Sequence, residues 1–344
     1  MLNFLEIENF KCIKKQSFEL PPLTILTGIN STGKSSIIQS ILLLSKNYSQ
    51  INKDLLSRCI ANLSEFTEIR NKYQNAKSLQ LAVIDSNGSK FDLYMDYDQT
   101  SAVSDVNSDS LNYEDRIYYI SAKGIGQEEL ALFSKDQKVG NNGEFIFGYF
   151  ENNKDTSLAV FKYEGSSTLK YQLNCWLEHI LELPIELQTE KTTATTVKVF
   201  FNSDGINNIS PFNLGAGNSY VVKVLITCLM CNQGDTVLIE NPEIHLHPKT
   251  QAKLGDFFAW LAQNGVQVIL ETHSEHVINR ISYQAYSQEI NSDKIKIYYK
   301  PSIQEDFIPI GINHRGHFIN RDGDKIIFPS GFFDSTLQEL LEMG

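Results

Sequence analysis

Residues 28–35 carry side chains and glycines whose spacing is suited to binding phosphate. They read Gly-Ile-Asn-Ser-Thr-Gly-Lys-Ser, the G-x-x-x-x-G-K-[ST] pattern of a P-loop. In such a loop, backbone N–H groups surround phosphate oxygens and the following helix adds the positive end of its dipole. Lys34 can reach the β- and γ-phosphates of a nucleotide, and the Ser35 hydroxyl can bind Mg²⁺. The segment therefore predicts a nucleotide site.

The residues on either side of the loop fit this prediction. Residues 23–27 are apolar and rich in β-formers, which predicts a strand, and residues 36–44 have apolar residues at helical spacing. Strand, glycine loop and helix in this order are what the phosphate chemistry requires.

An acidic residue follows a second apolar strand. Residues 236–239 predict a largely apolar strand, and Glu240 stands at its end. This is the arrangement of a Walker B motif, in which the carboxylate binds Mg²⁺ directly or through water. A buried carboxylate at a strand end needs such a partner to offset its desolvation.

A histidine follows the next strand. Residues 266–270 predict this strand, and the helix predicted over 251–263 would connect it to the Glu240 strand as a parallel βαβ unit. His273 would then lie at the same sheet edge, where ligands bind in open α/β sheets. It could contact the γ-phosphate or orient the attacking water.

A second glycine-rich segment precedes an apolar helix predicted over residues 220–229. Gly215, Gly217 and Ser219 lie at its start, where backbone N–H groups can bind an anion. A second phosphate site, so far from the P-loop in sequence, suggests that ATP is shared between two subunits. The alternative is an ordinary glycine-rich turn in which Ser219 caps the helix.

The order of these motifs resembles an ABC-type ATPase head. Residues 240–248, Glu-Asn-Pro-Glu-Ile-His-Leu-His-Pro, resemble more narrowly the small AAA-type ATPases related to OLD-family nucleases and to Septu-type and retron-associated anti-phage systems. Residues 8–11, 271–276 and 329–334 fit the same group. The resemblance covers most of residues 1–50 and 205–344 and is loose over 51–200.

This resemblance implies a fold and a set of roles. The fold would be α/β, a P-loop NTPase of ABC-ATPase-head type whose mixed sheet is formed by residues 1–50 and 205–344. Residues 51–204 would be an inserted β/helical lobe. Two protomers would bind ATP between them, with Ser35 and Glu240 as Mg²⁺ ligands, His273 as the switch histidine, and Gly215, Gly217 and Ser219 on the partner's nucleotide. The P-loop contacts would come from Gly28, Asn30, Ser31, Thr32, Gly33, Lys34, Ser35 and Ser36.

Two positions depart from the ABC pattern. The usual signature Leu-Ser-Gly-Gly-Gln is replaced by Leu-Gly-Ala-Gly-Asn at residues 214–218, and Asn241 stands where the catalytic carboxylate normally follows the Mg²⁺ ligand. A neutral amide cannot take a proton. Either Glu243, two residues on, is the catalytic base, or hydrolysis is slow and the protein acts as an ATP-gated clamp; we favour Glu243.

Composition argues against several classes of protein: those wrapped in nucleic acid, those that span a membrane and those that are secreted. The 344 residues carry a net charge of −11, which argues against a protein wrapped in nucleic acid, although a local basic patch is compatible with it. Neither a membrane span nor a secretory signal is expected. Five thinly spread cysteines suit reduced thiols in a cytoplasm, and Cys228 and Cys231 are interpreted as buried core residues.

Several other segments are predicted from local pattern. His245 and His247 are interpreted as a packing loop without a metal, and residues 322–324 as a hairpin turn before a strand over 325–328. Residues 87–88, Asn-Gly, predict a hairpin. We expect a mobile loop over 98–115, a turn and strand over 138–150, partial helix over 47–78, and a short helix at the C-terminus.

Two functions remain open at this stage. The first is an ATPase subunit that binds and hydrolyses ATP with Mg²⁺, dimerises around it and regulates a separate nuclease or toxin in phage defence. The stretch after His273 is short for a fused nuclease domain. The second is a DNA-repair ATPase of the SMC or RecF type that clamps DNA directly; the acidic balance and the lack of long heptads oppose it.

Overall fold

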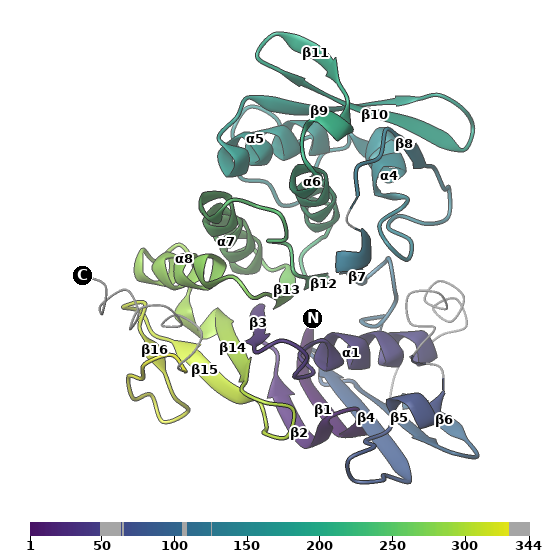
Figure 1. Ribbon diagram of the computed structural model, residues 1–344, viewed down its shortest axis with the longest axis vertical. Coiled ribbons are helices and arrows are strands. Elements are labelled where there is room, and N and C mark those ends of the chain that lie inside the picture. The colour runs from purple at the N-terminus through teal and green to yellow at the C-terminus, as the bar shows by residue number, and fades with distance from the viewer. Residues whose placement is uncertain (49–62, 64, 105–108, 125, 330–344) are drawn as a thin grey trace.

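The computed structural model describes residues 1–48, 63, 65–104, 109–124 and 126–329. Within this part a seven-stranded central sheet has the order β16-β15-β14-β3-β13-β12-β7 (Figure 1). The P-loop strand β3 therefore lies beside β13, and β13 separates it from β12. The strands are β3 (Leu23–Gly28), β7 (Ile117–Ile120), β12 (Thr236–Glu240), β13 (Gln267–Glu271), β14 (Ile295–Lys300), β15 (Ile308–Ile312) and β16 (Phe318–Ile319).

Five neighbouring strands of the central sheet, β14, β3, β13, β12 and β7, run parallel. Helix α7 (Pro248–Gln263) connects β12 to β13, which confirms the predicted βαβ unit. Strands β3 and β13 are buried along their whole length, as expected for parallel strands covered on both faces. The mixed α/β fold predicted from the motifs is thus confirmed, and the C-terminal ends of β3, β13 and β12 meet at one edge.

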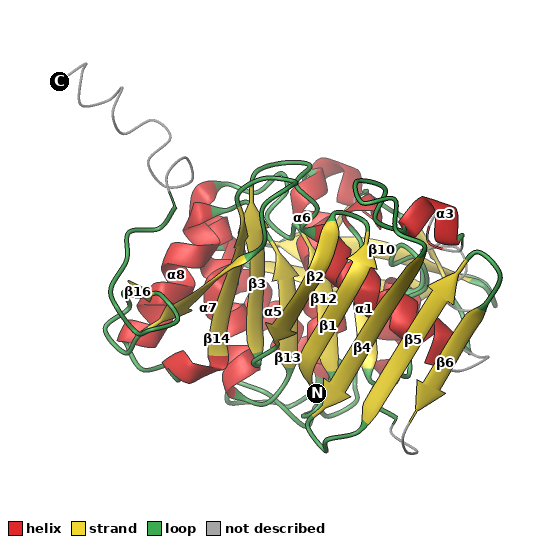
Figure 2. Ribbon diagram, turned by 90° about the horizontal axis from the view of Figure 1, so that it is seen from below, coloured by secondary structure: helices red, strands yellow, loops and turns green. Residues whose placement is uncertain are grey.

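An outer antiparallel sheet of order β2-β1-β4-β5-β6 faces the viewer in Figure 2. Helix α1 (Ser35–Tyr48), which follows the P-loop, packs on its inner face. One hydrophobic cluster joins α1, the outer sheet and one face of the central sheet, to which Leu26, Leu238 and Ile269 contribute. The strands are β1 (Leu2–Phe10), β2 (Ile13–Glu19), β4 (Ser78–Asp85), β5 (Lys90–Asp96) and β6 (Thr100–Ser104).

The other face of the central sheet is covered by helices α6 (Ala216–Leu229), α7 and α8 (Glu275–Tyr286). Beyond them lies a lobe of α4, α5 and a small sheet (Figure 1). Trp176 of α5 is fully buried against Phe257 and Trp260 of α7, which joins the lobe to the head. The lobe elements are α4 (Ile146–Asn153), α5 (Leu169–Leu181), β8 (Leu130–Leu132), β9 (Ile185–Lys191), β10 (Thr196–Ser203) and β11 (Ile206–Ile209).

Strand pairing crosses the predicted boundary between head and insert. β1 pairs with β4, and β12 pairs with β7, so residues from the predicted insert 51–204 belong to both large sheets. Only α4, α5 and β8–β11 form the lobe beyond the helices. The division of the chain at residues 51 and 204 stays a prediction.

Two predictions from local composition are wrong. Residues 138–150 were expected to form a turn and a strand, but α4 begins at Ile146. Ile146, Phe147 and Phe150 are buried at helical spacing, so packing overrides the β preference of these aromatic and branched residues. Residues 100–104, expected within a mobile loop, form β6 against β5.

Other local predictions have mixed outcomes. The Asn-Gly hairpin joins β4 to β5, and the turn at 322–324 forms, with Asn320 Oδ1 accepting the N–H of Asp322 at 3.0 Å. The strand expected after that turn is reduced to one bridge between Ile319 and Lys325. Within 47–78, the helices described are the end of α1 and the short α3 (Phe66–Ile69). The C-terminal helix and residues 330–334 of the family-like segment lie outside the described residues.

The Gln267 side chain fastens the two sheets together at the start of β13. It is fully buried; its Oε1 accepts from the N–H of Leu2 at 2.9 Å and from Thr236 Oγ1 at 2.8 Å. Its Nε2 donates to the carbonyls of Leu2 and Leu20, both at 2.7 Å. All four hydrogen-bonding positions of the amide are therefore used to join β1 and β2 to β12 and β13.

We predict that Gln267→Ala lowers the free energy of unfolding by about 3 kcal/mol, because it leaves backbone groups of Leu2 and Leu20 buried without partners. Urea denaturation monitored by circular dichroism measures the change. Gln80→Ala, at an exposed position of β4, is the control and should change stability by less than about 0.5 kcal/mol. Equal effects of the two substitutions would contradict this role of Gln267.

Candidate nucleotide-binding site

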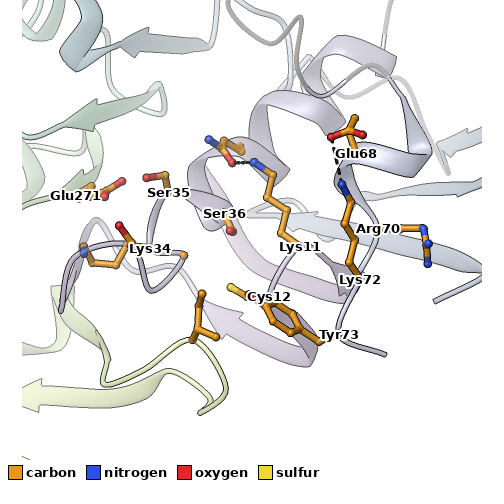
Figure 3. A pocket seen from close by; sticks show the side chains of 14 residues that line it. Lys11, Cys12, Lys34, Ser35, Ser36, Glu68, Arg70, Lys72, Tyr73 and Glu271 are labelled. Atoms are coloured by element: carbon orange, nitrogen blue, oxygen red, sulfur yellow. Dashed lines mark hydrogen bonds and ion pairs between the residues drawn. The ribbon is translucent and has the colours of Figure 1, made fainter. Parts of the chain in front are cut away.

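The P-loop borders a cavity of about 440 Å³ between β3, α1 and the segment after β1 (Figure 3). Two of its glycines are required by geometry. Gly28 has φ +134°, and a Cβ there would lie 2.2 Å from the carbonyl oxygen of Lys300. Gly33 has φ +99°, and its Cβ would lie 2.2 Å from Cys12 Sγ. The loop residues on the cavity wall are Ser31, Gly33, Lys34, Ser35 and Ser36.

Lys34 is nearly buried and folds back onto its own loop. Its Nζ donates to the carbonyl oxygens of Gly28 at 3.1 Å and Ile29 at 2.7 Å. Burial lowers the pKa of Lys34, and the charge of Glu271 opposes this shift. A phosphate could replace these two carbonyl acceptors. Of the other predicted loop residues, Asn30 is exposed, and the buried Thr32 donates its hydroxyl to Ile29 at 2.8 Å.

Glu271, at the end of β13, is a site residue to which the sequence reasoning gave no role. It lines the P-loop cavity, and the Ser35 hydroxyl donates to its carboxylate. Burial raises the pKa of Glu271 to about 7, helped by the charges of Glu240 and Glu243 and opposed by Ser35 and Lys34. Its Oε2 is buried without a hydrogen-bond partner among the described residues.

Glu240, the predicted Mg²⁺ ligand, faces the neighbouring strand β7. Its Oε2 accepts from Ser121 Oγ at 3.5 Å, and Tyr119 and the N–H of Ala122 also donate to the carboxylate. Burial raises its pKa. Glu240 is not on the wall of the cavity, so the structure places Glu271 instead against Ser35. The predicted role of Glu240 as a Mg²⁺ ligand beside Ser35 stays a prediction.

Glu243 and His273, predicted from separate motifs, are brought together. Glu243 Oε1 accepts the backbone N–H of His273 at 2.7 Å, while its Oε2 is buried and unpaired within the described part. Burial raises the pKa of Glu243, which makes the carboxylate a better base. Burial, helped by the charge of Lys34, lowers the pKa of His273 to about 4, so its imidazole is neutral near pH 7.

The second glycine-rich segment is less accessible than predicted. Gly215 is exposed at the start of α6, but Gly217 is buried against the carbonyl of His245. Ser219 is 1% exposed, and its hydroxyl has no partner among the described residues. A direct contact of Ser219 with a partner's nucleotide is therefore not available in this conformation. One residue further, the Tyr220 hydroxyl donates to the carbonyl of Glu240 at 2.7 Å.

The loop after β12 holds two residues in the left-handed region. Asn241 has φ 45° and His245 has φ 62°, conformations that cost energy for residues other than glycine. Asn241 Oδ1 is also buried without a described partner. Backbone strain and an unpaired polar atom thus occur together beside Glu243, the predicted base.

The remaining predictions concern metals and membranes. Cys228 and Cys231 are buried as expected, and burial raises the pKa of both thiols. His247 Nδ1 accepts the N–H of Lys249 at 3.3 Å and caps α7. Among the described residues no group of three or more His, Cys, Asp or Glu side chains is arranged to hold a metal ion. No helix in the described part is long and apolar enough to cross a membrane.

Strand order, P-loop and carboxylate positions define an ABC-like ATPase head, and comparisons with known proteins agree. A solved structure of an Smc head bound to the C-terminal winged-helix domain of ScpA has a TM-score of 0.61 at 12% identity, covering 90% of this chain and 98% of that one. An Smc head with an extended coiled coil, bound to the C-terminal domain of ScpA from Pyrococcus furiosus, has a TM-score of 0.58 at 11% identity and 99% coverage of both chains. At such identities the likeness concerns the fold.

One sequence comparison identifies the family, and a second finds a more distant relative. The family described as "AAA domain, putative AbiEii toxin, Type IV TA system" matches residues 70–279, more than half of the chain, and the chain belongs to it. The match begins after the P-loop and includes Glu240, Glu243, Glu271 and His273. The Old nuclease of Escherichia phage P2 is 23% identical over 366 residues, covering 87% of this chain. The chain spans 62% of the length of that relative. The chain is thus an ABC-like ATPase-family member related to the Old nuclease.

We predict a pH-dependent stability term from Glu271 in the metal-free protein. The pKa of this group is about 7 in the folded chain and near the usual glutamate value when unfolded. Between these values the folded state binds more protons, so this contribution to stability falls as pH rises from about 5 to 8, by about 3 kcal/mol. Glu271→Gln stays neutral and should therefore gain stability relative to wild type at pH 8 compared with pH 5.

Urea denaturation at the two pH values measures this difference. Glu190→Gln, at an exposed position of β9, is the control and should show little pH-dependent difference from wild type. A Glu271→Gln difference that is the same at pH 5 and pH 8 would refute the raised pKa.

Proposed function

We propose that this chain is an ATPase subunit that binds and hydrolyses ATP, dimerises head to head around it, and regulates a partner nuclease or toxin in bacterial anti-phage defence. The observation that carries the proposal is the P-loop cavity itself. Lys34 lies beside Glu271, and the unpaired buried oxygens of Glu271 and Glu243 lie nearby. Such groups are costly without a ligand, and a nucleotide with its cation would satisfy them.

The donor set fits Mg²⁺. This ion binds proteins through one or two carboxylates and takes its other ligands from water and substrate phosphates, so a cluster of three acidic side chains is not required. Ser35 and Glu271 would hold it, with Glu240 on the neighbouring strand reaching it through water. When bound, the ion neutralises phosphate charge as the bond to the γ-phosphate breaks.

Glu243 is the residue we assign to proton transfer. Its Oε1 is fixed by the His273 N–H, which leaves Oε2 to accept a proton from the attacking water. The neutral His273 side chain can donate a hydrogen bond to the γ-phosphate. Asn241, in the usual place of the base, could orient the water through its amide but could not deprotonate it.

Dimerisation would supply the other half of the site. Gly215 presents a helix start to solvent and does not border the P-loop cavity. In a head-to-head pair it would face the nucleotide of the partner subunit, where helix N-termini bind phosphate. The buried Ser219 would need α6 to shift before it could contribute.

The proposal places the nuclease or toxin activity in a separate effector protein. Its relative is named a nuclease, and this chain spans only part of that protein. Among the described residues no acidic cluster suitable for a nuclease metal site is present. In this proposal the cleavage activity lies in a partner chain, and the ATP state of the head controls it.

We predict that Lys34→Ala weakens ATP binding at least about tenfold, since it removes a charge-assisted contact to phosphate. Glu243→Gln should keep ATP affinity but lower turnover about 100-fold or more, because the base is lost. Glu243→Asp should retain part of the rate. Equilibrium binding and phosphate release measure the two effects, with Glu164→Gln, exposed in the lobe, as the control. Normal turnover in Glu243→Gln would reject Glu243 as the base.

We also predict that Glu243→Gln forms a stable dimer with ATP and Mg²⁺, because the bound nucleotide is not consumed. Light scattering after size-exclusion chromatography measures the mass with ATP and with ADP. Lys34→Ala should remain in the nucleotide-free state under both conditions. A saturated but monomeric Glu243→Gln protein would argue against dimerisation, and strongly salt-dependent DNA affinity of the isolated chain would favour a DNA clamp.

A further inference from the structure

The P-loop cavity extends beyond the phosphate-binding residues. Its far wall is formed by Glu68, Lys72 and Tyr73, from α3 and the turn that follows it (Figure 3). A volume of about 440 Å³ falls in the range of sites that hold whole small-molecule ligands. The P-loop accounts for one end, which leaves the other end with no role in phosphate binding.

The segment before this turn is fastened to the end of β1. The N–H of Lys11 donates to the carbonyl of Ile69 at 2.7 Å, and the N–H of Asn71 donates to the carbonyl of Asn9 at 2.8 Å. Phe10 and Arg70 form an antiparallel bridge. The position of the turn relative to the P-loop cavity is therefore set by backbone hydrogen bonds.

The turn itself, residues 71–76, is closed by side chains that point inward. The buried Asn71 accepts the N–H of Gln74 at 3.1 Å through Oδ1. Arg70 Nη1 donates to Asn75 Oδ1 at 2.9 Å and to the carbonyl of Ala76 at 3.1 Å. The turn is thus ordered without using the side chains of Lys72, which pairs with Glu68, or Tyr73.

The Tyr73 side chain does not contribute to the packing or hydrogen bonding of the turn. It is 66% exposed, and no hydrogen bond or ring contact within the described part engages it. Tyr97 nearby is 51% exposed but packs edge-on against Phe66, with Arg70 over its ring. A large aromatic side chain held at a cavity mouth by an ordered turn is suited to stacking on a flat ring.

The charges between the two ends also fit a nucleotide. Lys11 lies on the cavity wall between the P-loop and the turn, and its Nζ contacts Gln39 Oε1. Lys72 pairs with Glu68 at 3.2 Å at the outer end. Lys34, Lys11 and Lys72 therefore place positive charges along the length of the cavity. The whole chain, by contrast, carries a net charge of −11. Glu68 and Lys72 together supply an acceptor and donors for the edge of a base.

We propose that Tyr73 stacks on the base of the bound nucleotide, so that the turn 71–76 is the nucleoside-binding end of the site and favours purines. The inference rests on the proposed function, because it assumes that the P-loop holds the triphosphate. It assigns the base contact to a segment after α1, outside the P-loop motifs. Purines expose the larger ring face, so they gain more than pyrimidines from this stacking.

The test compares ligands with and without a base. Titration calorimetry with Mg²⁺ measures affinity for ATP, CTP and inorganic tripolyphosphate in wild type, Tyr73→Ala and Tyr73→Phe. Tyr73→Ala should weaken ATP binding roughly tenfold, CTP less, and leave tripolyphosphate unchanged, while Tyr73→Phe stays close to wild type. Tyr286→Ala, at a tyrosine of α8 that is 60% exposed, is the control and should match wild type.

The outcomes separate this inference from the proposed function. Lys34→Ala should weaken ATP and tripolyphosphate alike, whichever residue binds the base. Tyr73→Ala that leaves ATP affinity unchanged, or weakens both ligands equally, would overturn the stacking role while nucleotide binding stands. Wild-type protein that bound neither ligand would reject the proposed function and this inference with it.

Discussion

The side-by-side position of two carboxylates, the buried Glu271 and the half-buried Glu240, is the constraint around which this head is organised. In the parallel register of β12 and β13, Glu240 is the partner of Glu271, and Glu271 in turn is the partner of Leu26 on the P-loop strand. Like charges at that distance raise the free energy of the ionised pair, and burial adds to the cost. Lys34 and Ser35 lower this cost at Glu271. Tyr119 of β7, with Ser121 and the N–H of Ala122 just after it, lowers the cost at Glu240. A nucleotide-bound cation would complete the compensation, so sheet register and ligand chemistry are linked.

The same alternation that aims these carboxylates also positions the helices. Leu238 and Ile269 face α1, whereas Val237 and Val268 face α6 and α7. Residues 240 and 271 continue the α1 series, which directs both side chains toward the P-loop helix. Gln267 joins the opposite ends of the strands to Leu2 and Leu20, so the sheets cannot slide without breaking three buried hydrogen bonds. The relative positions of Glu240, Glu271 and the P-loop thus depend on the hydrogen bonds of Gln267 at the other end of the strands.

Local features could be predicted from the sequence, and features that depend on strand order could not. The P-loop, the βαβ unit and the burial of Cys228 follow from spacing and hydrophobic pattern. The role of Glu271 does not, because it requires knowing that β13 lies between β3 and β12, an order that residues distant in sequence decide. The Mg²⁺ role of Glu240 was predicted from its strand alone, and that strand does not reveal that Tyr119 of β7 and Ser121, just after β7, donate to its carboxylate. The prediction for Ser219 rested on its place at a helix start, but the folded chain leaves it only 1% exposed.

Several features of the site raise the free energy of the folded chain, and a bound nucleotide would relieve them. Lys34 donates to carbonyls of its own loop, and Asn241 and His245 have left-handed backbones. Within the described part of the chain, Glu271 and Glu243 each have one buried oxygen without a hydrogen-bond partner. Gly217 contacts His245, and Tyr220 contacts the Glu240 carbonyl, so α6 bears directly on the strained loop. A nucleotide that moved Lys34 and Glu271 would alter the field at Glu243 and, through this loop, the start of α6. Gly215 lies at that start and faces solvent. These contacts connect the loop after β12, which carries Glu243, with the start of α6.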